Sequence, residues 1–336
     1  MTTSDTLQGQ RLVRVGFRRV EVESFDVPHP QAGQILIQQT ITAVSTGTEV
    51  YSFVHGAEPG REPRFPGPTG YCSTGIVLEV GNGVDHVSPG DRVAAQGNHA
   101  SHLLATGLVY RLPDGVAEQD AAYLTMAAIA MHGIRRARVE LGESVVVLGL
   151  GVVGQLTVSL AGLAGALPTI ALDLDEDRLA LAQRRGGDYT MSSHDAAATI
   201  ATVQNLCAGD GADVVIEATG KPAVYPLAAR LTRTGGRVVA LGSPRGSIEM
   251  DFLRDIHLRE VNLIGAMQPL TPEGDHVYFP WTKNRERELL LELMARDRLR
   301  AGDLITHRAE PQSCQSIYEM LADRPSEALG VVFDWR

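Results

Sequence analysis

The sequence has little of two residue types that would point to particular protein classes. Cysteine occurs only at Cys72, Cys207 and Cys314. Because these are odd in number and far apart, we expect no disulfide framework, no cysteine-rich zinc lobe and a reducing, cytoplasmic location. Lysine occurs only at Lys221 and Lys283, and Pro222 follows the first of them. The chain therefore lacks the G-x-x-x-x-G-K-[ST] loop that binds phosphates.

Positive charge is also scarce. The 336 residues carry 30 Lys and Arg against 40 Asp and Glu, which gives a formal net charge of −10. A protein that binds duplex nucleic acid needs a basic surface, so we expect no nucleic-acid partner. The first residues contain no apolar run typical of a secretory signal, so none is expected.

One long stretch, from Ser144 to Leu172, has no charged residue. It is long enough for a membrane helix, which needs about 20 apolar residues. However, six interior residues interrupt it: Gly149, Gly151, Gly154, Gly162, Gly165 and Pro168. The stretch divides into an apolar run, a glycine turn, a helical segment and a second apolar run. This order favours a strand–helix–strand unit buried in a sheet over a membrane span, so we expect no membrane partner.

The pattern of short apolar runs changes along the chain. Residues 1–118 contain strand-length runs separated by turn clusters, which predicts a small antiparallel barrel or sandwich. Residues 119–268 alternate apolar strands with longer helical segments, which predicts an α/β, doubly wound parallel sheet. Residues 269–336 begin with a polar loop and continue with helix, strand, helix and strand.

The most specific motif is a G-x-G-x-x-G turn directly after the apolar run at residues 145–148. It consists of Gly149, Leu150, Gly151, Val152, Val153 and Gly154. The first glycine permits the tight turn, the second lets the backbone approach a pyrophosphate, and the third lets helix and strand pack closely. A helix N-terminus there would offer N–H groups to the pyrophosphate. The next apolar run ends at Asp173, as a dinucleotide-binding unit requires.

The residues around Asp173 favour NAD over NADP. Its carboxylate would accept hydrogen bonds from the ribose 2′-hydroxyl and would repel a 2′-phosphate. Three further acids follow and Arg178 is the only nearby cation. NADP stays possible, and so does a nucleotide fold that holds no cofactor.

At this point the chain resembles the medium-chain dehydrogenase/reductase superfamily of the zinc-type alcohol dehydrogenases. The resemblance covers nearly the whole length and includes PGDRV (89–93), GADVVIEATG (211–220), GGRVVALG (235–242) and LITHRAEP (304–311). It implies a GroES-like β-barrel domain over 1–118 to which 269–336 return, a Rossmann domain over 119–268, and an active site between them. It also implies cofactor contacts from Thr219, Gly242 and Ser243, and a homodimer.

The positions that hold catalytic zinc in this superfamily differ here. Where members have cysteine, histidine and a third ligand, this chain has Thr46, Tyr71 and Thr125. Zinc is bound by thiolate, imidazole and carboxylate groups, so the chain is predicted to hold no metal. A site built on Cys72 and Glu49 is the remaining alternative. These departures resemble a zinc-ligand-poor branch similar to bacteriochlorophyllide dehydrogenases and to sugar and cyclitol dehydrogenases.

Without a metal, hydrogen-bond donors must stabilise the negative charge that develops on the reacting oxygen. The resemblance points to Tyr71 first, because it stands at the position of the zinc-binding histidine, and to Thr48 as a hydroxyl relay. Glu49 could accept a hydrogen bond from Tyr71 or act as general base, and His102 could contact substrate. For each of them a purely structural role is the alternative. His132, on an apolar helix, is interpreted as an interior residue.

We therefore expect a zinc-independent, NAD(P)-dependent oxidoreductase that transfers hydride between nicotinamide and a secondary alcohol or ketone on a small molecule. The branch resemblance suggests a sugar, a cyclitol or another polyhydroxylated substrate. The first alternative is an NADPH-dependent reductase of the C=C bond in enones or quinones. The second is a catalytically inactive nucleotide-binding scaffold or redox sensor.

Overall fold

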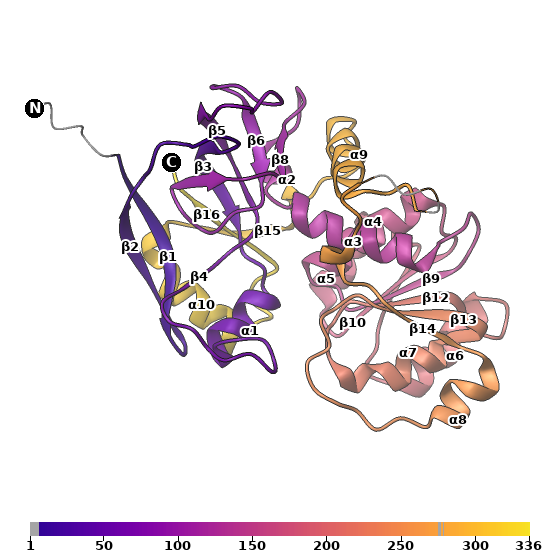
Figure 1. Cartoon of the computed structure of the whole chain (residues 1–336). Coiled ribbons are helices and arrows are strands. Elements are labelled where there is room, and N and C mark those ends of the chain that lie inside the picture. The colour runs from indigo at the N-terminus through magenta and orange to yellow at the C-terminus, as the bar shows by residue number, and fades with distance from the viewer. Residues whose placement is uncertain (1–6, 275–276, 278) are drawn as a thin grey trace, which may run out of the picture. The chain divides into compact units, whose positions relative to one another are not determined.

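The computed structural model describes residues 7–274, 277 and 279–336. The chain forms two compact units (Figure 1). Unit 1 comprises residues 1–125 and 283–336, and unit 2 comprises residues 126–282. The C-terminal segment therefore belongs to the same unit as the N-terminal one. None of the helices in the described part of the chain has the length and hydropathy that crossing a bilayer demands.

Unit 1 is built on two mainly antiparallel sheets. The smaller sheet has the order β2 (Arg19–Asp26), β1 (Gln8–Gly16), β4 (Gly67–Pro68). The larger has the order β15 (Ile305–Ala309), β16 (Gly330–Asp334), β3 (Ile35–Ala43), β5 (Ser73–Val80), β6 (Arg92–Ala95), β8 (Val109–Arg111), and β7 (His102–Ala105) also pairs with β3. β16 joins β3 antiparallel, so the end of the chain completes the sheet that the beginning starts.

The helices of unit 1 are α1 (Thr48–His55), α2 (Glu118–Ala121), α9 (Lys283–Ala295) and α10 (Cys314–Asp323). The α1 helix buries Glu49 and Phe53, which lie one turn apart on the same face. It ends at His55 and is followed by Gly56, whose φ of +81° suits glycine and whose N–H donates to the Ser52 carbonyl. Phe53 packs against Tyr318 of α10 in an apolar cluster that also contains Phe333. This packing fixes the start of α1, where several candidate residues lie.

Unit 2 contains a parallel sheet of the doubly wound type. Its order is β11 (Tyr189–Ser192), β10 (Thr169–Asp173), β9 (Val145–Leu148), β12 (Ala212–Glu217), β13 (Thr232–Ala240), β14 (Asn262–Gly265). Numbered from β9, this is the 3-2-1-4-5-6 order of dinucleotide-binding folds, in which ligands bind at the carboxyl ends of the strands. The four residues of β9 are all buried, which explains their continuous apolar run.

Helices cover both faces of this sheet, with α4 and α5 on one face and α6 and α7 on the other (Figure 1). The helices of the unit are α3 (Leu124–Ala137), α4 (Val152–Ala164), α5 (Glu176–Arg184), α6 (Ala196–Leu206), α7 (Tyr225–Leu231) and α8 (Phe252–Asp255). The uncharged stretch from Ser144 is thus β9, α4 and β10. The apolar core of this unit contains buried residues such as Val146 of β9, Ile170 of β10 and Val215 of β12.

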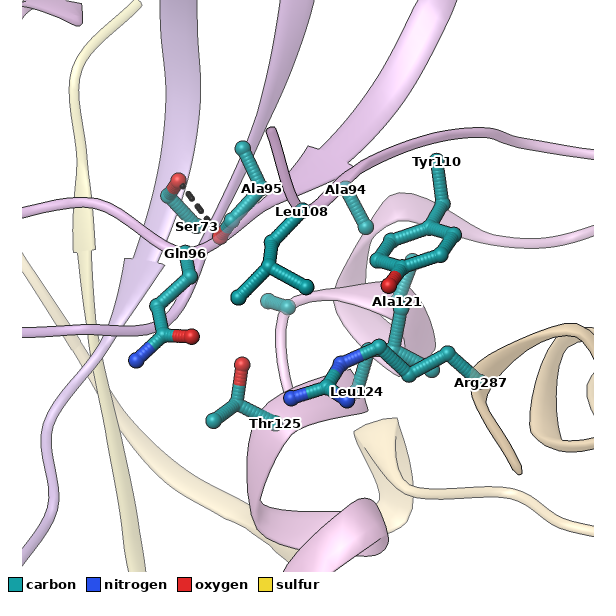
Figure 2. Close-up of a pocket in the computed structure, with 11 residues that line it drawn as sticks. Ser73, Ala94, Ala95, Gln96, Leu108, Tyr110, Ala121, Leu124, Thr125 and Arg287 are labelled. Carbon is teal, nitrogen blue, oxygen red and sulfur yellow. Dashed lines mark hydrogen bonds between the residues drawn. The ribbon is translucent and has the colours of Figure 1, made fainter. Parts of the chain in front are cut away.

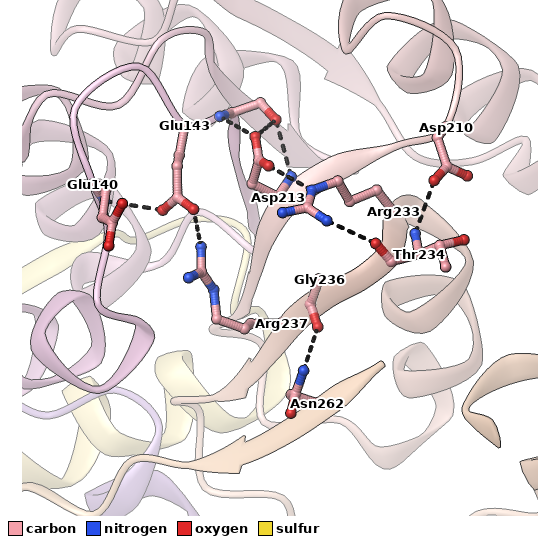
Figure 3. Close-up of polar contacts among 10 residues, drawn as sticks. Glu140, Glu143, Asp210, Asp213, Arg233, Thr234, Gly236, Arg237 and Asn262 are labelled. Carbon is pink, nitrogen blue, oxygen red and sulfur yellow. Dashed lines mark hydrogen bonds and ion pairs between the residues drawn. The ribbon is translucent and has the colours of Figure 1, made fainter. Parts of the chain in front are cut away.

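Charged side chains connect the strands at the amino-terminal edge of the sheet (Figure 3). Arg233 donates to Asp213 at 2.6 Å, and Asp213 also accepts from the Ser144 hydroxyl at 2.7 Å. Arg237 forms an ion pair with Glu143. These contacts join β9, β12 and β13 at the edge opposite the glycine turn, so this polar network contributes to the fold and lies away from the carboxyl ends.

The predicted fold class is confirmed, since the chain combines a β-rich unit with a doubly wound parallel sheet. One local prediction was incomplete. Residues 1–118 were expected to consist of strands and turns, whereas the segment after Ser45 forms the helix α1. The eight-residue helix is short, and packing against α10, far away in sequence, stabilises it.

Candidate active site

In unit 2, the glycine turn has the geometry that a dinucleotide requires. Gly149 has a φ of +95°, which disfavours other residues. A Cβ on Gly154 would lie 1.9 Å from the Gly149 carbonyl oxygen, so only glycine allows this approach of helix to strand. A Cβ on Gly151 would meet nothing within 4 Å, which leaves open space beside the backbone.

The N-terminus of α4 is available to an anion. The helix begins at Val152, and no side chain caps it. The backbone N–H groups of the first turn, including those of Val152 and Val153, therefore keep the donor capacity that binds phosphate at helix N-termini. Together with the open space at Gly151, this turn fits the pyrophosphate of a dinucleotide.

Asp173 ends β10 beside this turn. Its carboxylate accepts from the N–H of Leu150 at 2.5 Å, of Leu174 at 2.7 Å and of Asp175 at 3.1 Å. A carboxylate offers about four acceptor sites, so one direction stays open for a ribose hydroxyl. Arg178 lies on α5, with its Nε 3.9 Å from the Asp175 carboxylate.

The other predicted cofactor residues follow the carboxyl ends of β12 and β13. Thr219 lies against Gly149, because a Cβ added to Gly149 would be only 2.4 Å from the methyl carbon of Thr219. The N–H of Thr219 donates to Glu217 at 2.6 Å. Gly242 allows an equally close approach, since its Cβ would lie 2.3 Å from the nitrogen of Gly220. Ser243 follows and is exposed. The sheet thus brings the turn, Thr219 and Gly242 to the same edge.

Sequence reasoning missed Glu217, which organises this edge. Its side chain is fully buried and accepts from the Thr219 N–H and hydroxyl and from the Gly220 N–H. Burial raises the pKa of Glu217 despite these bonds. The only available signal was the acid at the end of an otherwise apolar strand.

In unit 1, three hydroxyl groups lie together at the start of α1. The Tyr71 hydroxyl donates to Ser45 Oγ at 2.6 Å. Thr48, the first residue of α1, lies beside the Tyr71 hydroxyl. Burial, followed by the neighbouring Cys72 thiol, raises the pKa of Tyr71 well above its ordinary value, so the phenol stays protonated.

Glu49 does not accept from Tyr71, which had been one of its two expected roles. Its Oε1 accepts from the Ser45 N–H at 2.7 Å, and its Oε2 accepts from Tyr318 at 2.5 Å and lies 3.0 Å from His99 Nε2. All three side chains are buried, at 6% exposure for Glu49 and 0% for the others. Because a carboxylate only accepts, His99 must carry its proton on Nε2.

The electrostatics of Glu49 follow from these donors. Burial alone would raise its pKa, but the neighbouring His99 and the hydrogen bonds from Tyr318 and Ser45 together hold the pKa below its ordinary value. Glu49 is therefore ionised at neutral pH. Its bond to the Ser45 N–H fixes the backbone that presents the hydroxyl groups.

Sequence reasoning did not find His99, Tyr318 or Ser45. No motif marks His99, and Tyr318 lies 269 positions from Glu49. No periodicity or motif connects residues so far apart. His102, in contrast, begins β7, and its Nδ1 lies 3.0 Å from Ser101 Oγ. Burial lowers its pKa, and among the described residues no hydrogen bond joins it to the hydroxyl group of Tyr71.

The positions of the superfamily's zinc ligands carry side chains that do not fit zinc. Thr46 offers a hydroxyl, and Tyr71 a protonated phenol. Thr125 lines a small pocket beside the buried guanidinium of Arg287, which would repel a cation (Figure 2). Within residues 7–274, 277 and 279–336, no three His, Cys, Asp or Glu side chains gather in a group able to hold a metal. The donor set is therefore one of hydroxyls.

Comparison with known proteins agrees with this architecture. A family model described as zinc-binding dehydrogenase matches residues 152–277. The sorbitol dehydrogenase of Gallus gallus is 24% identical, with 93% of each chain covered. The D-guloside 3-dehydrogenase of Escherichia coli K12 is 29% identical over 90% of this chain and 93% of its own. Galactitol-1-phosphate dehydrogenase from Escherichia coli has the same fold, with a TM-score of 0.83, 19% identity and coverage of 97% and 99%.

The fold and the glycine turn define a dehydrogenase that uses a nicotinamide dinucleotide. The resemblance that the sequence motifs predicted is confirmed, since residues 152–277 match that family model and the listed dehydrogenases are similar over most of the chain. The expectation that it is an enzyme of the medium-chain type is also confirmed.

Proposed function

We propose that this protein is a zinc-independent dehydrogenase that interconverts a secondary alcohol and a ketone on a polyhydroxylated small molecule. The observation that carries the proposal is the hydrogen bond from Tyr71 to Ser45, at the position where the superfamily has a zinc-binding histidine. Hydroxyl donors there would stabilise a developing alkoxide in place of a metal. One well-aimed donor contributes roughly 2.7–4 kcal/mol to the transition state.

A bound nicotinamide dinucleotide supplies the acceptor or donor of hydride. The residues that would hold it are the turn Gly149, Gly151 and Gly154 with Val152 and Val153, together with Asp173, Arg178, Thr219, Gly242 and Ser243. The open acceptor direction of the Asp173 carboxylate, with three further acids following it, supports NAD over NADP.

The roles of the chain's own residues follow from their contacts. Tyr71 and Thr48 belong to the cluster of hydroxyls at the start of α1, which would face the reacting oxygen. Glu49 is ionised but already accepts three hydrogen bonds, so it supports a positioning role better than that of a general base. His102 is neutral and half-buried, and we retain it as a substrate contact.

A substrate screen tests the reaction. The full chain is incubated with a panel of polyols, sugars and cyclitols and either NAD⁺ or NADP⁺, and the appearance of reduced nicotinamide is followed. We expect turnover of at least one polyol, faster with NAD⁺. Turnover only of enones or quinones with NADPH would instead establish the C=C reductase, and binding of NADH without turnover of any substrate would establish a scaffold or sensor.

The polyol class is supported by relatives whose names specify sorbitol and a guloside. A homodimer is supported by β14 at the end of the parallel sheet and by exposed apolar side chains around it, including Leu253, Leu258 and Leu263. Light scattering of the purified chain tests the dimer, and a monomeric mass would reject it. A cytoplasmic location is supported by the absence of a disulfide among the three cysteines, all of which the structure describes.

A further inference from the structure

The three hydroxyls of unit 1 form a directed row. Tyr71 donates its proton to Ser45 Oγ at 2.6 Å, and the Thr48 hydroxyl lies beside Tyr71. Ser45 is the last member, because its oxygen accepts from Tyr71 and its own proton is committed to no acceptor among the described residues. The row therefore ends in a hydroxyl that can still donate.

Ser45 is also the member whose position is most firmly fixed. Its N–H donates to Glu49 Oε1 at 2.7 Å, and its carbonyl accepts from the Glu49 N–H at 2.9 Å. These two bonds tie Ser45, which lies two residues before the N-cap Gly47, to the first turn of α1. The other oxygen of Glu49 is held by His99 and Tyr318, so the buried cluster anchors the backbone under the Ser45 hydroxyl.

We propose that Ser45, rather than Tyr71, is the catalytic residue that contacts the reacting oxygen, and that Tyr71 acts through it. Thr48, Tyr71 and Ser45 then form a proton relay. This inference rests on the proposed alcohol–ketone reaction. It assigns to Ser45 a role that its place before the zinc-ligand position does not suggest.

The proton balance of the relay is closed. When a ketone is reduced, its oxygen takes the Ser45 proton as the hydride arrives at carbon. Ser45 takes the proton that Tyr71 already donates to it, and Tyr71 recovers a proton from water by way of the neighbouring Thr48 hydroxyl. Oxidation of the alcohol runs the same transfers in reverse, after the hydroxyls have turned. The two electrons travel with the hydride of the proposed reaction, so the relay carries protons only. Because every hydroxyl gives and receives a proton together, no tyrosinate accumulates, which suits a buried phenol.

Three variants test the relay: Ser45→Ala, Tyr71→Phe and the double variant. Each single variant should lower kcat by about 10²–10³-fold, on the magnitude for one lost donor. The double variant should lose no more than either single variant, because groups that act as a unit are not additive. Ser52→Ala, which removes a hydroxyl from the neighbouring helix α1, is the control and should keep parental turnover.

A second measurement separates a relay from a structural effect. The dependence of kcat on the D₂O fraction should be curved for the parent chain, since several protons move together, and linear for Tyr71→Phe. A Ser45→Ala variant with turnover within threefold of the parent, beside a slow Tyr71→Phe, would show that Tyr71 contacts substrate itself and would overturn the inference. If the parent chain turns over no alcohol or ketone, the proposed function fails instead, so the two failures are distinct.

Discussion

Replacement of Glu49 by glutamine is the sharpest perturbation of unit 1. The carboxylate accepts from three donors, namely the Ser45 N–H, His99 Nε2 and the Tyr318 hydroxyl. Glutamine offers one oxygen and one NH₂ group in the same volume. Whichever way the amide is turned, at least one buried donor then faces another donor.

The expected cost follows from the burial of this cluster. Hydrogen bonds to a charged group contribute about 1.5–3 kcal/mol each, and a buried donor left without an acceptor costs about 1–3 kcal/mol. Breaking a buried charged contact typically costs about 3–5 kcal/mol. We therefore expect Glu49→Gln to lower the free energy of unfolding of unit 1 by about 3–5 kcal/mol.

Urea unfolding followed by tryptophan emission measures this change. The chain has two tryptophans, and a Trp281→Phe background leaves Trp335, whose Nε1 donates to Thr42 next to His99. Glu319→Gln, which alters an exposed acid on α10, is the control and should change stability by at most about 0.5 kcal/mol. A Glu49→Gln variant within about 1 kcal/mol of its parent would refute the reasoning, since the buried contacts would then carry no net energy.

The same variant has a pH signature. The folded-state pKa of Glu49 lies below its ordinary value of 4.5, so the unfolded chain takes up this proton first. The stabilisation from Glu49 is therefore fully present above about pH 4.5 and is lost as the pH falls through the folded-state pKa. The parent should lose this part of its stability in that acid range, whereas Glu49→Gln should lack it. Equal slopes for the two chains would contradict the assignment.

Further predictions concern unit 2. Gly151→Ala should unfold like the parent chain but bind NADH at least about tenfold more weakly by fluorescence titration, because its Cβ enters open space beside the phosphate turn. Gly154→Ala should also lower the melting temperature, because its Cβ would lie 1.9 Å from the Gly149 oxygen; equal melting of the two variants would contradict this. Asp173→Asn should reduce the preference for NAD⁺ over NADP⁺ in competition titrations, and an unchanged preference would show that Asp173 does not select the cofactor. Burial, with Arg136 nearby, lowers the pKa of His132 from 6.5 to about 4, so stability should fall as the pH drops from 6.5 to 4, and His132→Gln should remove that dependence in acid titrations of unfolding.

Much of unit 2 could be predicted from local sequence. The apolar run 145–148, the glycine turn and Asp173 lie within about 30 residues, and each has a direct physical reason to be where it is. The strand order then follows from right-handed connections between short neighbouring elements. Glu217 was missed, because a buried acid at a strand end has no motif of its own.

Less of unit 1 could be predicted from the sequence, because its site depends on contacts between segments that are distant in the chain. The resemblance located Tyr71, Thr48 and Glu49, but their partners come from a loop at His99 and from α10 near the end of the chain. The short helix α1 exists because α10 packs on it, and that packing is invisible in a local pattern. Without it, Ser45 could not be identified as the residue that Tyr71 contacts.

We propose that hydroxyl groups, and no metal ion, stabilise charge on the reacting oxygen. The most direct test measures turnover of the best polyol with NAD⁺ before and after exhaustive treatment of the full chain with a chelator, with metal content determined on the same samples. We expect equal kcat in chelated and untreated protein and no gain on adding zinc. A kcat that falls in proportion to removed metal, and returns when zinc is restored, would contradict it.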